Sequence, residues 1–306
     1  MSHLKTQAFH HVGVAFQLML LWSCSNSGKA ESGSCGASCD CAVQCQSQGA
    51  WFVADSVNFQ VCSLRSSSEA KLVAHHCEAV RKNLVKPWSQ DAQAWNPRCQ
   101  IVLHSEAQTY VRTIGRGGEN TLASALVKRA RGSIALRRID LRSDVADYLT
   151  AALPHEMCHV VLADQLPNAP LWLDEGIAIL ADPVAKQRLH ERDLRLGLER
   201  GTAFSAEELL GLRTYPQAER WGVFYGQSAS LVRLLLSRGS AADLVELANS
   251  TNEVGANLAL RETYGLSGLP EVERMWRQEA PPILHDTWIA LAKYPASSLV
   301  AVTRRP

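Results

Sequence analysis

Three stretches with different patterns of hydrophobic and polar residues follow one another along the 306-residue chain. An apolar run occupies residues 12–22, and a stretch rich in Ser, Gly and Cys occupies residues 25–48. From residue 49 onward, apolar residues recur with the periods of strands and helices. Within this last part, apolar or alternating runs predict strands at 51–64, 99–104 and 133–141, and helical spacing predicts a helix over 67–88.

The second half of the chain is predicted to be mostly helical. One helix begins between residues 150 and 154, because a proline such as Pro154 is tolerated only in the first turn. Further helices are predicted over 184–200, 205–212, 225–238, 241–249 and 270–279, and residues 281–306 are interpreted as a tail. The pattern predicts an α+β fold, with a small sheet-containing part over 49–142 followed by a mostly helical part over 143–280.

The first 24 residues have the features of a signal peptide. Lys5 precedes an apolar core of eleven residues, which is shorter than a membrane span of about 20 residues. Ser23-Cys24 at the end of this core resembles a bacterial lipobox, in which Cys24 is lipidated and tethers the protein to a membrane. Ordinary cleavage nearby is the alternative. We therefore expect an exported protein of the cell envelope, either periplasmic or lipid-anchored.

Cysteine content and charge narrow the class of protein further. Nine cysteines agree with an oxidising compartment. The spacing C-x3-C-x-C-x3-C differs from the C-x2-C pairs of zinc knuckles and favours a disulfide-linked linker over 25–48, through Cys35, Cys39, Cys41 and Cys45. Pairing is also expected among Cys62, Cys77, Cys99 and Cys158, with no connectivity selected. A net charge of +1 disfavours a nucleic-acid partner.

The candidate chemistry lies at residues 155–159, where the sequence His-Glu-Met-Cys-His forms an H-E-x-x-H pattern. Residues four apart lie on one face of a helix, so the imidazoles of His155 and His159 can bind one metal ion. Glu156 is displaced around the helix by about 100° and is suited to take a proton from a water molecule on that ion. Cys158 points to another face and is expected in the core.

A catalytic zinc ion requires a third protein ligand and one open position. The extended pattern H-E-x-x-H-x-x-G-x-x-H is excluded, because Leu162 and Gln165 occupy its glycine and third histidine positions. Glu175 is the remaining candidate, on a second apolar-periodic segment, and Gly176 beside it has no Cβ to keep the two helices apart. Three carboxylates are candidates for orienting the histidines: Asp164, Asp174 and Asp182.

The segment Trp172-Leu173-Asp174-Glu175-Gly176-Ile177-Ala178 matches W-L-x-E-G-x-A. Together with H-E-x-x-H it resembles the gluzincin metallopeptidases, in particular the peptidase MA-like or aminopeptidase-N-like group. The resemblance covers about residues 150–235 and implies a zincin-like domain over 49–280. It implies one Zn²⁺ per chain, bound by His155, His159 and Glu175, with Glu156 as general base. It also implies that the strand at 133–141 borders the cleft and pairs with an extended peptide.

The same family carries a tyrosine on a later helix that hydrogen-bonds the oxyanion of the tetrahedral intermediate. Tyr225 stands where that motif is expected, ahead of an apolar run, although the acidic and basic residues of Y-E-K-G are missing. Tyr215 and Tyr148 are the alternatives. The G-x-M-E-N stretch of the exopeptidases is absent, so the resemblance does not imply aminopeptidase activity. The leading hypothesis is a zinc-dependent endopeptidase or related amide hydrolase of the cell envelope, acting on a peptide or protein substrate.

A second function is compatible with the same residues. The histidines are then ordinary core or surface residues, Glu175 is an acidic residue favoured by the helix dipole, and Tyr225 packs its ring. In that case the protein is a catalytically silent envelope protein that uses a peptidase-like fold for binding. The presence of all three ligands and of Glu156 favours the peptidase. A structural zinc site is disfavoured, because such sites are typically rich in cysteine and closed.

Overall fold

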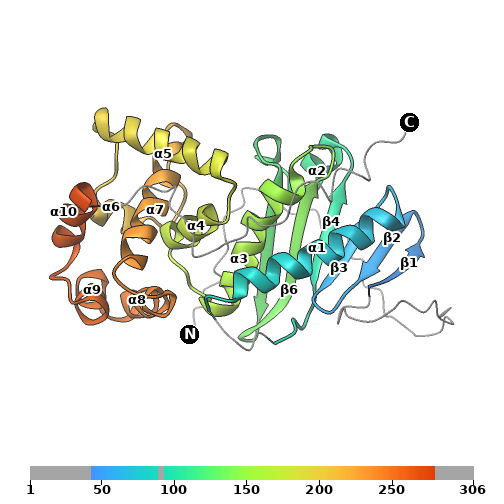
Figure 1. The fold of residues 1–306 in the computed structure, drawn as a ribbon, viewed down its shortest axis with the longest axis horizontal. Coiled ribbons are helices and arrows are strands. Elements are labelled where there is room, and N and C mark those ends of the chain that lie inside the picture. Colours follow the sequence, from blue (N-terminus) through green and yellow to red (C-terminus); the bar gives the residue numbers. More distant parts are fainter. Residues whose placement is uncertain (1–42, 89–92, 280–306) are drawn as a thin grey trace, which may run out of the picture.

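A six-stranded mixed sheet forms the N-terminal part of the chain in a computed structural model, which describes residues 43–88 and 93–279 (Figure 1). The strand order is β1-β2-β3-β4-β6-β5. The strands are β1 Gln44–Gln48, β2 Trp51–Asp55, β3 Phe59–Ser63, β4 Cys99–His104, β5 Ala123–Ala130 and β6 Ser133–Arg142. Strands β3, β4 and β6 are parallel, whereas β1, β2 and β5 are antiparallel to their neighbours.

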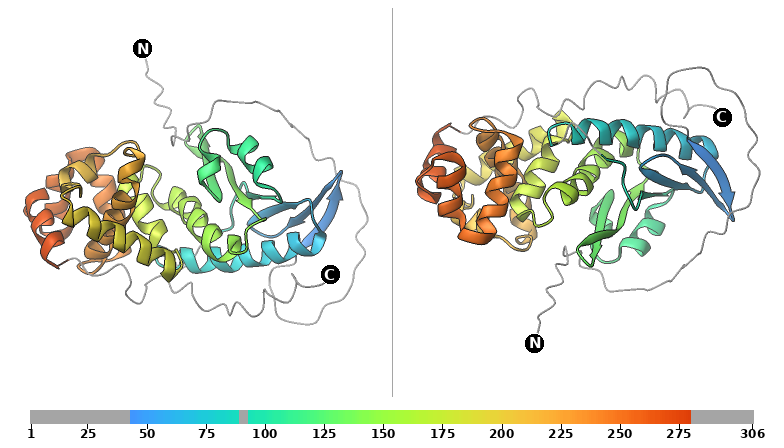
Figure 2. Two further views of the ribbon diagram at one scale, coloured as in Figure 1. Left: turned by 90° about the horizontal axis from the view of Figure 1, so that it is seen from above. Right: turned by 90° about the horizontal axis from the view of Figure 1, so that it is seen from below.

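Alternation along the central strands decides which helices cover which face. Ile101 and Leu103 of β4 are buried on the face that packs against α1 (Ser67–Val85) and α3 (Leu153–Gln165). The next residue, His104, points to the opposite face and contacts Tyr110 of α2 (Ala107–Ile114), with ring centroids 5.6 Å apart. Figure 2 accordingly shows α1 and α2 on opposite sides of the strands.

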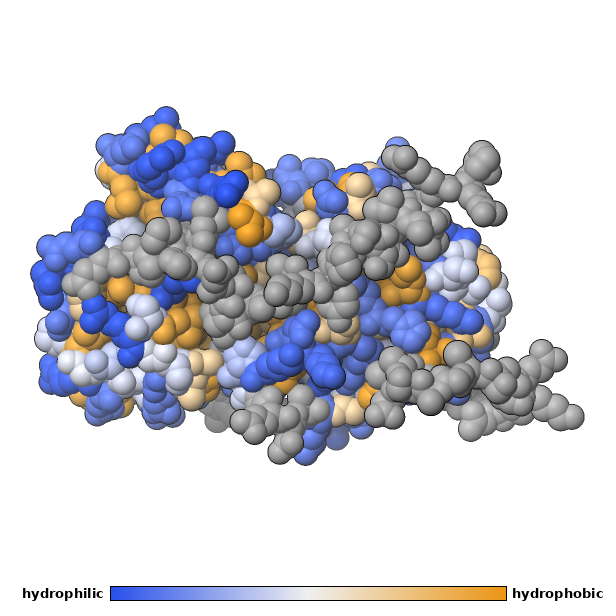
Figure 3. Space-filling view, in the orientation of Figure 1, coloured by the Kyte–Doolittle hydropathy of each residue, from blue (hydrophilic) through white to orange (hydrophobic). Residues whose placement is uncertain are grey.

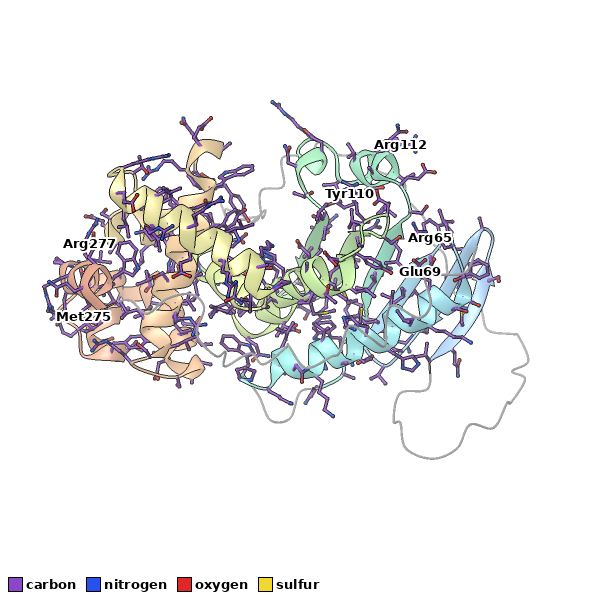
Figure 4. All side chains as sticks on the ribbon, turned by 45° about the horizontal axis from the view of Figure 1, so that its top comes forward. Arg65, Glu69, Tyr110, Arg112, Met275 and Arg277 are labelled. Atoms are coloured by element: carbon purple, nitrogen blue, oxygen red, sulfur yellow. The ribbon has the colours of Figure 1, made fainter. Side chains whose placement is uncertain are left out.

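The remaining helices form a helical half that lies to one side of the sheet (Figure 1). They are α4 Leu171–Leu180, α5 Val184–Glu199, α6 Ala206–Gly211, α7 Trp221–Leu236, α8 Ala241–Val254, α9 Ala256–Tyr264 and α10 Leu269–Glu279. Helix α7 is central and packs against both α4 and α5. Met275 and Arg277 of α10, labelled in Figure 4, mark the end of this helical half far from the sheet. The predicted α+β fold is confirmed.

The surface of the helical half is mixed in character. Helix α5 turns Leu194 and Gly197 toward α7 and exposes Arg188, Arg192 and Arg195. The space-filling view accordingly shows hydrophilic residues gathered over α5, interspersed with apolar ones (Figure 3). Among the described residues, no helix combines the length and the apolar character needed to cross a bilayer.

Several predicted strands differ from the observed ones. The stretch 51–64 is two strands, because the carboxylate of Glu78 accepts hydrogen bonds from Ser56 and Asn58 and stabilises a turn between them. Strand β1 lies inside the stretch 25–48 that was predicted to be a linker, so that boundary is wrong. The side chains of β1 are mostly exposed and polar, and only its backbone pairing with β2 identifies it as a strand.

The helix predictions are largely confirmed, with shifted ends. The helices predicted over 67–88, 184–200, 205–212, 241–249 and 270–279 correspond to α1, α5, α6, α8 and α10. Helices α2 and α9 and strand β5 are not predicted from the sequence. Helix α2 buries only Tyr110, and α9 buries only Ala259 and Leu260, so neither carries an apolar stripe long enough to be recognised.

The cysteines that the structure describes are all free. Cys62, Cys77, Cys99 and Cys158 do not pair with one another, so the expected disulfides among them are not formed. Cys45 is also free and lies in β1. Cys158 is buried in the core, as predicted. Four predictions lie outside the described residues: the disulfide-linked linker at Cys35, Cys39 and Cys41, the signal peptide, lipidation of Cys24, and the tail at 281–306.

Candidate metal centre

Helix α3 carries the two candidate histidine ligands on one face. It begins at Leu153 with Pro154 in its first turn, within the predicted limits, and follows a π-helical turn at Tyr148–Ala152. Its apolar residues, such as Met157 and Val161, pack into the core and fix the rotation of the helix. The imidazoles of His155 and His159 are therefore neighbours, with ring centroids 5.0 Å apart.

Helix α4 brings the third candidate ligand to the histidines. Glu175 Oε2 lies 3.6 Å from His155 Nε2 and 4.0 Å from His159 Nε2. One donor atom from each of the three residues lies within 4.8 Å of the others. The side chain of Glu175 is buried, and Oε2 has no hydrogen-bond partner among the described residues. Two imidazole nitrogens and one such carboxylate oxygen fit a zinc ion that keeps one further position for water.

Gly176 allows a close contact between two helices, but the partner of α4 is α7 and not the predicted α3. A Cβ on Gly176 would lie 2.6 Å from the backbone oxygen of Ser228 and 2.6 Å from Val232 Cγ2, both on α7. The missing side chain therefore permits close contact between α4 and α7, not between α4 and α3. Glu175 is adjacent to Gly176 in the chain and is itself buried.

Two of the three predicted orienting carboxylates contact the histidines. Asp182 Oδ1 lies 3.2 Å from His155 Nδ1, and Asp174 Oδ1 lies 3.1 Å from His159 Nδ1, in an ion pair without hydrogen-bond geometry. Both contacts leave the Nε2 atoms facing Glu175. The prediction for Asp164 is wrong, because its carboxylate pairs with the guanidinium of Arg137 at 2.5 Å.

The surrounding charges determine the protonation of the metal-free centre. Burial lowers the pKa of both imidazoles, but the carboxylates of Asp182 and Glu175 raise that of His155 to about 9. Asp174 and Glu175 likewise raise the pKa of His159 to about 10 against the effect of burial. Burial raises the pKa of Glu175, and the two imidazolium charges outweigh it and lower that pKa to about 2. A metal ion binding here displaces protons from the histidines.

Glu156 lies on the neighbouring face of α3, half-buried. Its negative charge contributes to the raised pKa of His159 and to those of the phenols of Tyr110 and Tyr225. The predicted base is thus within electrostatic reach of one candidate ligand and of the predicted oxyanion donor.

Tyr225 lies in the second turn of α7, whereas the sequence predicted it at the start of that helix. Helix α7 begins at Trp221, because Gly197 of α5 makes room for Val223 and allows the first turn to pack. The ring of Tyr225 is tilted against His190, with centroids 5.5 Å apart. Burial and the charges of Glu175 and Glu156 raise the pKa of its phenol, so the hydroxyl is protonated.

Tyr215 makes a contact that the sequence did not predict. Its hydroxyl donates a hydrogen bond to Glu175 Oε1. Tyr215 lies between α6 and the short helix Ala218–Arg220, in a segment without periodicity, so no sequence signal connects it to Glu175. The other alternative, Tyr148, lies in the π-helical turn, where Glu69 of α1 is its hydrogen-bonding neighbour.

The end strand of the described sheet next to the centre is β5. Strand β6 is hydrogen-bonded to β4 on one side and to β5 on the other, so the prediction that 133–141 pairs with a peptide is wrong. Strand β5 is the terminal strand of the sheet, and α3 packs against it. Ala123 and Ser124 at the start of β5 are buried, and its other end is exposed.

Comparison with known proteins adds no further constraint on this site. No protein-family model matches the chain. No curated protein matches it either.

Proposed function

We propose that the protein is a zinc-dependent endopeptidase of the gluzincin type. The observation that carries the proposal is the convergence of His155, His159 and Glu175, with a buried glutamate oxygen that has no hydrogen-bond partner among the described residues. Burying a carboxylate oxygen without a hydrogen bond costs free energy. The nearby imidazolium charges offset that cost in the metal-free centre, a zinc ion bound by the three side chains would offset it in their place, and Asp174 and Asp182 hold the imidazoles in the orientation that the ion requires.

Glu156 and Tyr225 then have different roles in the proposed reaction. When bound, zinc lowers the pKa of a water molecule toward about 7 and polarises a carbonyl group. The Glu156 carboxylate accepts the proton of the attacking water and passes it to the nitrogen of the leaving amine. The protonated phenol of Tyr225 donates a hydrogen bond to the oxyanion of the substrate.

The position of β5 at the end of the described sheet supports an extended peptide as the substrate. A peptide lying beside the exposed end of β5 would pair with it by β-augmentation, next to the helix that carries the candidate metal ligands. A strand edge binds the interior of a chain and needs no free terminus, so this mode favours an endopeptidase. We also propose that the protein is exported to the cell envelope, through the signal-peptide features of residues 1–24.

Metal analysis combined with peptide cleavage tests the proposal. We expect the purified full chain to contain one zinc ion and to cleave a peptide library. Glu156→Gln has nearly the same shape but cannot accept the proton, so it should keep the zinc and lose about 10² or more in rate. Zinc binding without cleavage by the wild type would support the catalytically silent envelope protein instead. Cleavage by Glu156→Gln at the wild-type rate would show that Glu156 is not the base.

A further inference from the structure

The two carboxylate oxygens of Glu175 have different surroundings. Oε1 accepts a hydrogen bond from the hydroxyl of Tyr215. Oε2 has no hydrogen-bond partner among the described residues and points toward the Nε2 atoms of His155 and His159. The side chain of Glu175 is 5% exposed, so water has little access to either oxygen. One oxygen of the carboxylate is therefore engaged by protein and the other is directed at the metal position.

The position of Tyr215 is determined by contacts with α7. Its ring packs edge-on against Phe224, with centroids 6.0 Å apart and an interplanar angle of 80°. The next residue, Pro216, accepts a hydrogen bond of 2.8 Å from the indole nitrogen of Trp221. Phe224 is fully buried, so the tyrosine rests on a fixed surface although its segment has no regular secondary structure.

Tyr215 and Tyr225 cannot exchange roles in this arrangement. A phenol has one proton to donate, and Tyr215 donates it to Glu175. It is therefore not available for an oxyanion at the same time. Tyr225 has no such contact with Glu175 and remains the candidate for the oxyanion. The sequence left Tyr215 and Tyr225 as alternatives for one role. The structure separates them: Tyr215 contacts Glu175, and Tyr225 remains the candidate for the oxyanion.

We propose that Tyr215 is a positioning residue that restricts Glu175 to binding the metal through one oxygen. This inference rests on the proposed function, since it needs a metal at the centre. A carboxylate with both oxygens free can bind a metal through both, and the second oxygen would compete for the position that water needs. By occupying Oε1, Tyr215 orients Oε2 toward the histidines and keeps the fourth position open.

Zinc affinity and cobalt spectra of Tyr215→Phe test this role. The substitution keeps the ring against Phe224 and removes only the hydroxyl, so the fold is retained. The matched control is Tyr110→Phe, which removes the hydrogen bond of 2.8 Å between the Tyr110 and Thr121 hydroxyls, a bond that involves neither the candidate ligands nor the side chains that contact them. Competition with a chelator should show about 10–100-fold weaker zinc binding for Tyr215→Phe and wild-type affinity for the control.

Cobalt(II) in place of zinc reports on the number of ligands. Binding of Glu175 through both oxygens adds a ligand, and the visible absorption of cobalt weakens as the coordination number rises above four. We expect this weakening in Tyr215→Phe and not in Tyr110→Phe. A purely structural role for the hydroxyl would leave the spectrum of the bound cobalt unchanged.

Each outcome decides the question. Tyr215→Phe with zinc affinity within about twofold of the wild type and an unchanged cobalt spectrum overturns the role of Tyr215 and leaves the proposed function intact. Loss of the folded state in metal-free Tyr215→Phe, but not in Tyr110→Phe, assigns Tyr215 to structure and also overturns the inference. A wild-type chain that binds no zinc overturns the proposed function, and the inference with it.

Discussion

Each candidate ligand is held by a second side chain of its own. Asp182 contacts His155, Asp174 contacts His159, and Tyr215 contacts Glu175. Such outer contacts fix the tautomer and the orientation of a ligand, and their loss typically weakens metal binding by about 10–100-fold. Asp182 Oδ1, the oxygen that contacts His155, also accepts a hydrogen bond of 3.0 Å from Lys186. Each of the three candidate ligands is thus contacted by a side chain of the protein in the metal-free structure.

The oxyanion role of Tyr225 can be measured by removing its hydroxyl. We expect Tyr225→Phe to lower kcat by about 10²–10³, because a hydrogen bond to the oxyanion forms mainly in the transition state. KM and zinc content should change little. The phenol is expected to interact only weakly with the ground-state substrate, and it is not one of the candidate ligands. Steady-state kinetics on a cleaved peptide provide the measurement. An unchanged kcat would mean that Tyr225 only packs its ring against His190.

Zinc affinity should rise with pH, because the metal-free imidazoles carry protons that zinc must displace. The pKa values of about 9 for His155 and about 10 for His159 predict the release of about two protons per zinc at pH 7. Calorimetric titrations in buffers of different ionisation enthalpy count these protons. Release of fewer than about one proton would contradict the raised pKa values.

The same shifts predict how the metal-free fold depends on pH. An unfolded histidine has a pKa near 6.5, and the folded values are higher. The stabilisation is therefore fully present below about pH 6.5 and is lost as the pH rises through about 9 to 10. The urea midpoint of the chelator-treated protein should fall over this range. The fall should be smaller in a His155→Gln, His159→Gln double variant.

At the scale of elements, close contact between α4 and α7 places the third ligand. Gly176 of α4 lies against the backbone of Ser228, and Glu175 is its neighbour in the chain. Helix α3, in contrast, is held by the sheet through β5 and β6 and by α1. The two histidines thus lie on a helix that packs against the sheet, and Glu175 lies on a helix that packs against α7. The two parts meet where α3 contacts α4.

A methyl group at Gly176 should disrupt this contact. Gly176→Ala introduces a Cβ 2.6 Å from Ser228 O and should lower the free energy of unfolding by about 1–3 kcal/mol. Gly211→Ala, at the end of α6, is the matched control, because no atom lies within 4 Å of its added Cβ. It should be neutral or stabilising by up to about 1 kcal/mol. Equal urea midpoints for the two variants would argue against a tight α4–α7 contact.

At the scale of the whole molecule, one hydrophobic core runs through both halves. It includes Ile101 and Leu141 of the sheet, Met157 of α3, and Phe224 and Leu234 of α7. A continuous core favours cooperative unfolding of the sheet and the helical half as one unit. A metal ion bound by α3 and α4 would then add a cross-link at the junction between them.

Zinc should therefore raise the melting temperature of the entire protein. At a zinc concentration about 1,000 times Kd, binding stabilises the folded state by about 4.1 kcal/mol. For a chain of this size that corresponds to a rise in Tm of roughly 8–16 °C. Calorimetric scans with zinc and with a chelator measure the difference, and Glu175→Ala should show none of it. Two separate transitions would contradict a single cooperative unit.

Local patterns were sufficient to predict the fold class, most helices and the candidate ligands. Apolar residues at helical spacing identify α1 and α8, because a helix buries one stripe of its surface. The spacing of four between His155 and His159 brings them onto one face of any α-helix, whatever surrounds it. Glu175 was identified by its motif, and the structure brings it to the same point. These features depend on residues near one another in the chain.

Features that depend on contacts between distant segments required the tertiary structure. Strand β1 has polar side chains and is identified only by its hydrogen bonds to β2. Strand β5 and not β6 ends the described sheet, because strand order depends on pairing and not on local pattern. Tyr215 reaches Glu175 across 40 residues from a segment without periodicity. Burial, packing and hydrogen bonding at such separations follow from three-dimensional proximity, which local spacing along the chain does not encode.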